Sequence, residues 1–282
     1  MAAIAVVGSA NIDLVTHTPR RPGPGETIMG ISYSEHVGGK GVNQALAAAR
    51  LAATSFVGCL GIDAAAITIR KVLTNNGLGA SQVQASTSPT GRAFITVTPD
   101  GENSILVIAG ANTALTPEHT LHALDISDPS VVLTQLETPL SVATASAHWA
   151  YTNQRRFVLN ASPAAEIPRD LLAVADPLVV NETEARQLIR TDAAGDSLAS
   201  AVVALCRSAI ITLGARGAVL ADTSGLEHFT TPQVVVRDST GAGDAFAGTV
   251  AAHLALGHPL RHAIIDAVRA ASLVVATPRS TR

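Results

Sequence analysis

Short apolar runs alternate with longer segments of helical periodicity along most of this sequence. The runs are apolar throughout, which is typical of parallel strands buried on both faces of a sheet. The alternation predicts an α/β fold with a doubly wound, mostly parallel sheet and helices on both faces. The expected strands are residues 4–8, 54–61, 130–137, 156–162, 177–182, 208–214 and 217–222, and the expected helices include 41–53, 64–77, 182–190 and 197–206.

Two segments depart from this pattern because their residue types alternate without an intervening helix. One is residues 25–37, and the other is residues 91–110, which indicate two strands joined by a Pro-Asp-Gly turn. Alternating strands are typical of a sheet with one solvated face, so we expect a small β-sheet lid on the α/β body. The predicted boundaries are 15–37 and 91–110 for the lid, and 1–14, 38–90 and 111–282 for the body.

Composition narrows the classes of function. Apolar residues make up 47% of the 282 residues, and the net charge is −3 without a block of like charges. This balance argues against nucleic acid or an anionic membrane as the main partner. The two cysteines form no disulfide framework, no segment approaches the ~20 apolar residues of a membrane span, and the first apolar run indicates a strand rather than a signal peptide. We expect a soluble, cytoplasmic protein with small-molecule partners.

Polar residues stand where several predicted strands end. In an open α/β sheet, ligands bind beyond the carboxyl ends of the strands. Asn11 and Asp13 follow the first predicted strand, and Glu137 ends the strand at 130–137. The side chains of an Asn-x-Asp loop more often only stabilise a turn, and a glutamate at a strand end is commonly a solvated residue. Each motif alone therefore leaves a ligand-binding role open.

A glycine-rich segment, GGKGVNQA at residues 38–45, precedes a predicted helix. It lacks the spacing and the Ser or Thr of a P-loop, but its paired glycines allow a small ligand to approach the backbone. Lys40 and Asn43 could donate hydrogen bonds to such a ligand. The chain has 17 arginines and two lysines, so a compact ammonium is favoured at position 40, although chance explains one lysine equally well. A helix start alone accounts for the glycines but not for Lys40 and Asn43 together.

The motif NETEA at residues 181–185 also follows a predicted strand. Asn181, Glu182 and Glu184 offer the oxygen ligands that Mg²⁺ prefers, directly or through water. The same residues suit a helix start, with Asn181 as the N-cap and the glutamates complementing the helix dipole. The two interpretations are compatible.

The segment ITLGARGAV at residues 211–219 indicates a strand, a glycine turn and a second strand. Thr212 and Gly214 could line a nucleotide groove there. As a plain hairpin, the segment needs no ligand.

The most specific motif is DSTGAGDAFAG at residues 238–248, between the apolar run 234–236, expected to be a buried strand, and an Ala-rich predicted helix. Asp244 stands where a dinucleotide-binding loop would hold phosphate, and a carboxylate there would repel a resting pyrophosphate. It suits a base that takes a proton from an attacking hydroxyl, while neighbouring N–H groups stabilise a transferring phosphoryl group. The alternative, a first-turn helix acid worth about 0.3–1 kcal/mol, leaves the sequence Gly-Ala-Gly unexplained.

Together these motifs resemble the ribokinase family, the PfkB-type carbohydrate kinases. GGKGVNQALAAARLA is similar to the first signature of the family and DSTGAGDAFAGT to its second, and the likeness runs from GSANID to the end of the chain. The resemblance implies a Rossmann-like body with a β lid that commonly serves as a homodimer interface. It also implies ATP- and Mg²⁺-dependent phosphorylation of the primary hydroxyl of a sugar, with D-ribose giving ribose 5-phosphate as the first expectation.

The resemblance further implies a role for each matching residue. Asp244 would be the catalytic base, with the anion hole at Gly241, Ala242, Gly243 and Asp244. The expected sugar contacts are Asn11, Asp13, Gly39, Lys40, Asn43, Glu137 and Asp244. The expected nucleotide contacts are Asn181, Glu184, Thr212, Gly214, Gly217 and Gly243, with Glu184 also acting on Mg²⁺ through water. Asp238 and Thr240 would bind an activating K⁺ ion.

The sequence departs from the family pattern near its end. It reads ATPRSTR at 276–282, where the family has a glycine-containing loop with further K⁺ ligands, and Val268 and Arg269 stand where an Asn or His near the adenine is usual. We expect these differences to affect K⁺ activation and nucleotide affinity but not the transfer chemistry. The alternatives are a related kinase for another sugar or a nucleoside (deoxyribose, adenosine or pseudouridine) and a catalytically inactive sugar- or nucleotide-binding homologue.

Overall fold

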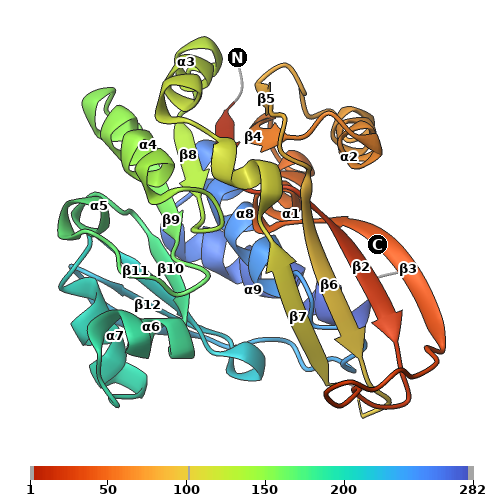
Figure 1. Cartoon of the computed structure of the whole chain (residues 1–282). Helices are drawn as coiled ribbons and strands as arrows, with labels where there is room; N and C mark the ends of the chain where they lie inside the picture. Colours follow the sequence, from red (N-terminus) through yellow and green to blue (C-terminus); the bar gives the residue numbers. More distant parts are fainter. Residues whose placement is uncertain (1–2, 101, 279–282) are drawn as a thin grey trace.

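The computed structural model of the chain describes residues 3–100 and 102–278 (Figure 1). Its main element is a nine-stranded sheet with the strand order β13-β12-β11-β10-β9-β8-β1-β4-β5. Neighbouring strands from β5 to β11 are parallel, whereas the β11–β12 and β12–β13 pairs at one edge are antiparallel. The strands are β1 Ile4–Val7, β4 Thr54–Leu60, β5 Val83–Ala85, β8 Val131–Thr134, β9 Arg156–Asn160, β10 Leu178–Asn181, β11 Ala209–Thr212, β12 Ala218–Asp222 and β13 Gly225–Phe229.

Helices cover both faces of this sheet, so the predicted doubly wound α/β class is confirmed. One face packs against α1 Lys40–Ala49, α2 Ala64–Asn75, α8 Ala242–Ala255 and α9 Leu260–Ala276. The other packs against α3 Pro117–Ser127, α4 Leu140–Thr152, α5 Arg169–Ala173, α6 Glu182–Ile189 and α7 Gly195–Val203. Because every residue of β1 and β8 is buried, each strand contributes side chains to both cores.

A second sheet of four strands, in the order β3-β2-β6-β7, stands apart from the main sheet (Figure 1). Its strands are β2 Asn11–His17, β3 Ser32–Gly38, β6 Gly91–Val97 and β7 Asn103–Ile108. The expected hairpin at 91–110 is present, although Gly101 of its turn lies outside the described residues. The expected strand at 25–37 is present only in its last six residues. Gly25 has a positive φ of 74°, and residues 26–31 belong to no strand.

The division into body and lid at the predicted boundaries remains a prediction. The chain leaves the main sheet after Val7, and β2 begins at Asn11, before the predicted lid start at residue 15. Three residues thus separate a strand of one sheet from a strand of the other. This short connection holds Asn11 and Asp13 where the two sheets meet.

The expected strand at residues 234–236 is wrong. The segment is irregular, and Val235 and Val236 are 70% and 69% exposed. Pro232 precedes it without an N–H to donate, and the backbone N–H groups of Arg237 and Asp238 donate to the carbonyl of Val275 at the end of α9 instead of to a neighbouring strand. The apolar run is therefore an exposed connection that leads into α8.

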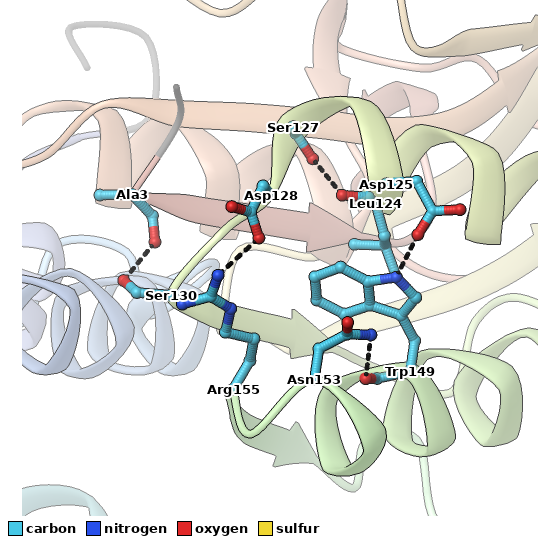
Figure 2. A network of polar contacts seen from close by, with 9 residues as sticks. All are labelled: Ala3, Leu124, Asp125, Ser127, Asp128, Ser130, Trp149, Asn153 and Arg155. Carbon is cyan, nitrogen blue, oxygen red and sulfur yellow. Dashed lines mark hydrogen bonds and ion pairs between the residues drawn. The ribbon is translucent and has the colours of Figure 1, made fainter.

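Polar contacts close the fold at the amino ends of β1 and β8, opposite the carboxyl ends (Figure 2). The indole Nε1 of Trp149 on α4 donates to Oδ1 of Asp125 on α3 at 2.7 Å. Arg155 forms an ion pair with Asp128 at 2.7 Å, and the hydroxyl of Ser130 donates to the carbonyl of Ala3 at 2.8 Å. These contacts tie α3, α4 and the first strand together on the side away from the predicted site.

In the described ranges 3–100 and 102–278, no helix combines the length and the apolarity that a membrane span requires.

Candidate active site

Asp244 lies in the first turn of α8 and is 8% exposed. Its Oδ2 accepts a hydrogen bond from Nδ2 of Asn43 at 2.9 Å, and its Oδ1 accepts one from Nε2 of Gln44 at 3.0 Å. Both donors belong to α1, which packs against α8. The carboxylate of the second motif is therefore held by two amides of the first, 201 and 200 residues away along the chain.

Several groups act on the ionisation of Asp244. Burial raises its pKa above the ordinary value, because the charged form loses its hydration. The positive charge of Lys40 and the two amide donors oppose this effect, whereas the negative charge of Glu137 adds to it. A carboxylate with a raised pKa is better matched to accepting a proton near neutral pH, as a general base must.

A cavity of about 140 Å³ lies in front of the first turn of α8. Gly241 caps this helix with a positive φ of 79°, and none of the described side chains makes a capping hydrogen bond to it. A helix N-terminus carries a partial positive charge that favours anions. The amide of Ala242, expected in the anion hole, donates to the carbonyl of Ser239 at 3.2 Å in this structure. The cavity is lined by Lys40, Asn160, Ser162, Val179, Val180, Asn181, Glu184, Thr212, Gly241, Gly243 and Asp244.

The residues expected to contact a sugar gather around the start of α1. Asn11 and Asp13 are both buried on β2, and the ladder between β2 and β3 places Asn11 opposite Gly38, directly before Gly39 and Lys40. A Cβ on Gly38 would lie 2.3 Å from the carboxylate of Asp13, so glycine is required for this side chain to fit there.

Glu137 reaches the same segment from the loop after β8. Its Oε2 accepts hydrogen bonds from the backbone N–H of Lys40 at 3.0 Å and from the hydroxyl of Ser9 at 2.5 Å. This carboxylate thus ties the loop after β8 to the start of α1. It is not simply a solvated residue at a strand end, which was the alternative interpretation.

A larger cavity of about 580 Å³ adjoins the first and shares Thr212 and Gly243 with it. The predicted hairpin forms part of its wall, with a 3₁₀ turn at Gly214–Arg216 between β11 and β12. Two of the three valines expected to form a strand, Val234 and Val236, line this groove. The lining comprises Thr212, Gly214, Ala215, Gly217, Thr231, Pro232, Gln233, Val234, Val236, Ser239, Ala242, Gly243, Phe246, Val268, Ala271, Ser272 and Val275.

The motif NETEA forms the start of α6, as its helix-capping interpretation predicts. Asn181 and Glu184 form a reciprocal capping box with hydrogen bonds of 2.8 and 2.9 Å. Both residues also border the smaller cavity, whereas Glu182 pairs with Arg216 and Arg186. A role of Asn181 and Glu184 toward Mg²⁺ remains a prediction.

Asp238 and Thr240 form a tight turn before α8, in which the amide of Thr240 donates to Oδ1 of Asp238 at 2.8 Å. Over residues 3–100 and 102–278, no group of three or more His, Cys, Asp or Glu side chains is arranged to hold a metal ion. The K⁺ role of Asp238 and Thr240 remains a prediction. Residues 279–282 of the divergent end lie outside the described residues.

Three buried amides beside Asp244 are not among the predicted site residues. They are Gln44 on α1, Gln135 after β8 and Asn160 at the end of β9. The sequence does carry a signal for them: Gln44 stands inside GGKGVNQA, and Gln135 and Asn160 each end an apolar strand. Buried polar side chains at strand ends usually need hydrogen-bond partners, and these three find one another.

The comparisons with known proteins agree over the whole chain. The pfkB family of carbohydrate kinases matches residues 1–282. A ribokinase of Bacillus subtilis (strain 168) is 36% identical over 280 residues, 98% of this chain and 93% of that protein. A bifunctional ribokinase/ribose-5-phosphate isomerase A of Fructilactobacillus sanfranciscensis is 36% identical over 287 residues; the match covers 98% of this chain but only 53% of that relative. The structure of Arabidopsis thaliana ribokinase complexed with ribose and ATP has a TM-score of 0.90 at 32% identity, covering 98% of this chain and 93% of that one.

Proposed function

The chain belongs to the pfkB family of carbohydrate kinases, and from this premise we propose that it transfers the γ-phosphoryl group of ATP to the primary hydroxyl of D-ribose, giving ribose 5-phosphate. The observation that carries the proposal is the position of Asp244. It borders the smaller cavity at the N-terminus of α8, beside the larger groove, and it is bound by Asn43 from the sugar-side motif. Ribose is the proposed sugar because the relatives from Bacillus subtilis and Arabidopsis thaliana are ribokinases, the second complexed with ribose and ATP.

In this mechanism the nucleotide lies in the larger groove with its phosphates toward the smaller cavity. Asp244 takes the proton of the sugar hydroxyl while the hydroxyl oxygen attacks the γ-phosphorus in line. Lys40 and the N-terminus of α8 stabilise the negative charge of the transferring group. Asn11, Asp13, Gly39, Asn43 and Glu137 hold the sugar so that its hydroxyl faces Asp244, and positioning of this kind supplies much of the rate acceleration.

Metal ions complete the proposal. Mg²⁺ would be organised by Asn181 and Glu184, the latter through water, which suits the presence of both residues at the cavity wall. When bound, Mg²⁺ neutralises phosphate charge during the transfer. Asp238 and Thr240, in the turn before α8, would hold an activating K⁺ ion beside the anion hole.

We also infer that the four-stranded sheet closes over the sugar and pairs two copies of the chain. Closure excludes water and so limits hydrolysis of ATP. The sheet carries exposed apolar residues on β7 and β6, including Leu106 and Phe94. The cytoplasm remains the predicted compartment, in keeping with Cys59 and Cys206, which are both described and form no disulfide.

The experiment that tests this function replaces Asp244 by Asn. Asp244→Asn keeps the size of the side chain but removes its ability to take a proton, so we expect turnover of ribose and ATP to fall by at least about 10³-fold. Ribose affinity, measured by calorimetry, should stay within about fivefold, because the amide can still fill the same position.

The matched control is Asp170→Asn, which changes another carboxylate in a first helical turn, on α5. It should leave turnover unchanged. Near-normal turnover in Asp244→Asn would contradict the assignment of the base and leave Asp244 as an ordinary first-turn helix acid.

A further inference from the structure

A chain of buried amides leads from the backbone of β10 to the carboxylate of Asp244. Nδ2 of Asn160 donates to the carbonyl of Val179 at 3.1 Å. Nε2 of Gln44 donates both to Oδ1 of Asn160 at 2.9 Å and to Oδ1 of Asp244 at 3.0 Å. Nε2 of Gln135 in turn donates to Oε1 of Gln44 at 2.7 Å. Gln44 is therefore held by three partners and is completely buried.

The direction of these hydrogen bonds is fixed by the backbone. A carbonyl can only accept, so Val179 requires Asn160 to present its NH₂ group there and its oxygen to Gln44. That oxygen also only accepts, so Gln44 must turn its NH₂ group toward Asn160 and Asp244. A flipped Gln44 would place its oxygen against two acceptors and its NH₂ group against the NH₂ group of Gln135. Gln44 is thus locked as a donor to Oδ1 of Asp244.

The two oxygens of Asp244 consequently differ. Oδ1 is bound by Gln44, which has no exposed surface, whereas Oδ2 is bound by Asn43, which is partly exposed. Asn43 is also a predicted sugar contact. A substrate hydroxyl on the sugar side therefore meets Oδ2, while Oδ1 remains committed to the interior.

We propose that Gln44, held by Asn160 and Gln135, is a positioning residue that fixes Oδ1 of Asp244 and presents Oδ2 to the substrate hydroxyl. This inference rests on the proposed transfer at Asp244. In that step the O–H bond of the sugar breaks and its proton goes to Oδ2. The sugar oxygen forms a bond to the γ-phosphorus, and the bond from that phosphorus to the bridging oxygen of ADP breaks.

The structure gives a reason why Gln135 is an amide and not an apolar residue. Its side chain fits only because residue 8 is glycine, since a Cβ there would lie 2.0 Å from Oε1 of Gln135. That Oε1 has no hydrogen-bond partner among the described residues. An apolar side chain of similar size would avoid an unpaired buried oxygen, so the feature that the site uses is the N–H donor to Gln44.

Charged groups face Asp244 from three other elements. Lys40 of α1 favours its ionised form and Glu137 of the loop after β8 disfavours it, and Glu184 of α6 borders the same cavity. Gln44 is neutral, and its hydrogen bond lowers the pKa of Asp244. Removing this bond should raise that pKa while leaving all three charges in place.

The test is Gln44→Met, which keeps most of the volume and removes the donor. We expect kcat to fall about 10- to 100-fold, the range in which a misplaced catalytic group acts, with KM for the sugar within about threefold. The acid limb of the kcat–pH profile should move to higher pH. Gln135→Met removes the hydrogen bond to Oε1 of Gln44 but keeps Gln44 itself. It should lower kcat and shift the acid limb in the same directions as Gln44→Met, but by smaller amounts.

The control is Gln84→Met. Gln84 also makes two hydrogen bonds with its amide, to Ala114 and Thr116, but lies away from Asp244. It should lower thermal stability without moving the pH profile. Unchanged kcat in Gln44→Met, or a lower kcat with an unmoved pH profile in both Gln44→Met and Gln135→Met, would overturn the proposal.

A measurement without substrate separates this inference from the proposed function. The pKa of the Asp244 carboxyl, followed by ¹³C NMR in protein with labelled aspartate and assigned with Asp244→Asn, should be higher in Gln44→Met than in the wild type. If ribose is not phosphorylated but another sugar is, the proposed substrate fails and Gln44 is tested on that sugar. If no sugar is phosphorylated, the NMR titration decides, and an unchanged pKa overturns the role of Gln44.

Discussion

Lys40 is the cation that acts on the pKa of Asp244. Its positive charge opposes the rise in the pKa of Asp244 that burial causes, and its side chain borders the cavity in front of α8. One lysine can therefore serve two purposes, since it favours the ionised form of Asp244 and, in the proposed mechanism, faces the developing charge of the transferring phosphoryl group.

Replacing this lysine should change both activity and its pH dependence. In Lys40→Met, we expect kcat to fall about 10²- to 10³-fold, the usual cost of losing one group that stabilises transition-state charge. Asp244 acts as a base only when ionised, and loss of the nearby cation raises its pKa further. The acid limb of the pH profile should therefore move to higher pH, so that activity at mildly acidic pH is lost first.

The control for this prediction is Lys71→Met, which removes the other lysine, an exposed residue on α2. Its pH profile should match that of the wild type. An acid limb that stays in place in Lys40→Met would show that Lys40 does not act on Asp244.

At the scale of residues, the sequence predicts the groups that motifs bring together and misses those that only folding brings together. Asn43 and Gln44 are neighbours in one motif, but only Asn43 was expected at the site. Gln44 is held at the site by hydrogen bonds with Gln135 and Asn160, which lie 91 and 116 residues further along the chain. Hydrogen bonds over such separations depend on strand order, which hydrophobic periodicity does not determine.

The residues at the start of α6 suit both helix capping and a role toward Mg²⁺. Asn181 and Glu184 cap the helix with each other, yet both border the cavity that is proposed to hold phosphates. A carboxylate oxygen has more than one lone pair, so Glu184 can accept from the backbone N–H of Asn181 and still face hydrated Mg²⁺.

The substitution Glu184→Gln separates the two roles. The amide oxygen of glutamine can still accept from Asn181, so the free energy of unfolding should fall by no more than about 1 kcal/mol, the contribution of a first-turn negative charge. The Mg²⁺ concentration needed for half-maximal activity should rise several-fold because the negative charge is lost. The measurements are chemical denaturation and a magnesium titration of turnover.

Glu182→Gln is the matched control, because Glu182 lies in the same first turn but pairs with Arg216 and Arg186. Its magnesium dependence should not change. If Glu184→Gln also keeps the wild-type magnesium dependence, Glu184 is a capping residue alone.

At the scale of elements, apolar patterning predicts the buried strands well but fails for residues 234–236, where apolar side chains line a groove. β1, β4, β8, β9, β10, β11 and β12 all lie within or beside their expected ranges. The run at residues 234–236 has the same composition as these strands, but Val234 and Val236 line a groove instead of a core. Apolar side chains are common in ligand grooves as well as in cores, and composition alone does not separate the two.

The four-stranded sheet carries an exposed apolar surface that bears on whether the whole molecule pairs with a second copy. The ladder between β6 and β7 places Leu106 opposite Phe94, and these side chains are 62% and 45% exposed. Because opposite residues point to the same face of a sheet, they form one apolar surface. Exposed apolar surface of this kind is typical of an interface.

If two copies pair through this sheet, Leu106→Asp should separate them. We expect light scattering to give a mass near twice 28.8 kDa for the wild type and near 28.8 kDa for the variant. A charge buried without a partner opposes association. Ile67→Asp, at a 71% exposed position on α2, is the control and should remain a dimer. A monomeric wild type would contradict the proposed pairing.

In the whole molecule, segments that are far apart in the sequence converge on the candidate active site. The carboxyl ends of β9, β10 and β11, the start of α1 and the N-terminus of α8 meet around two adjoining cavities. The fold class predicted from the sequence is confirmed, and the role of Asp244 as the base remains a prediction. The extent of the two cavities needed the structure, because their lining comes from segments distant in the chain.

The proposed phosphorylation of ribose is tested by measuring ADP release from ATP and Mg²⁺ with a panel of acceptors, with and without K⁺, and by identifying the product by mass. The panel comprises D-ribose, deoxyribose, fructose 6-phosphate, adenosine and pseudouridine. The predicted result is the highest kcat/KM with D-ribose and a product with the mass of ribose 5-phosphate. A higher kcat/KM with another acceptor would contradict the choice of ribose. No ADP release with any acceptor, despite calorimetric binding of ribose and ATP, would contradict catalysis itself.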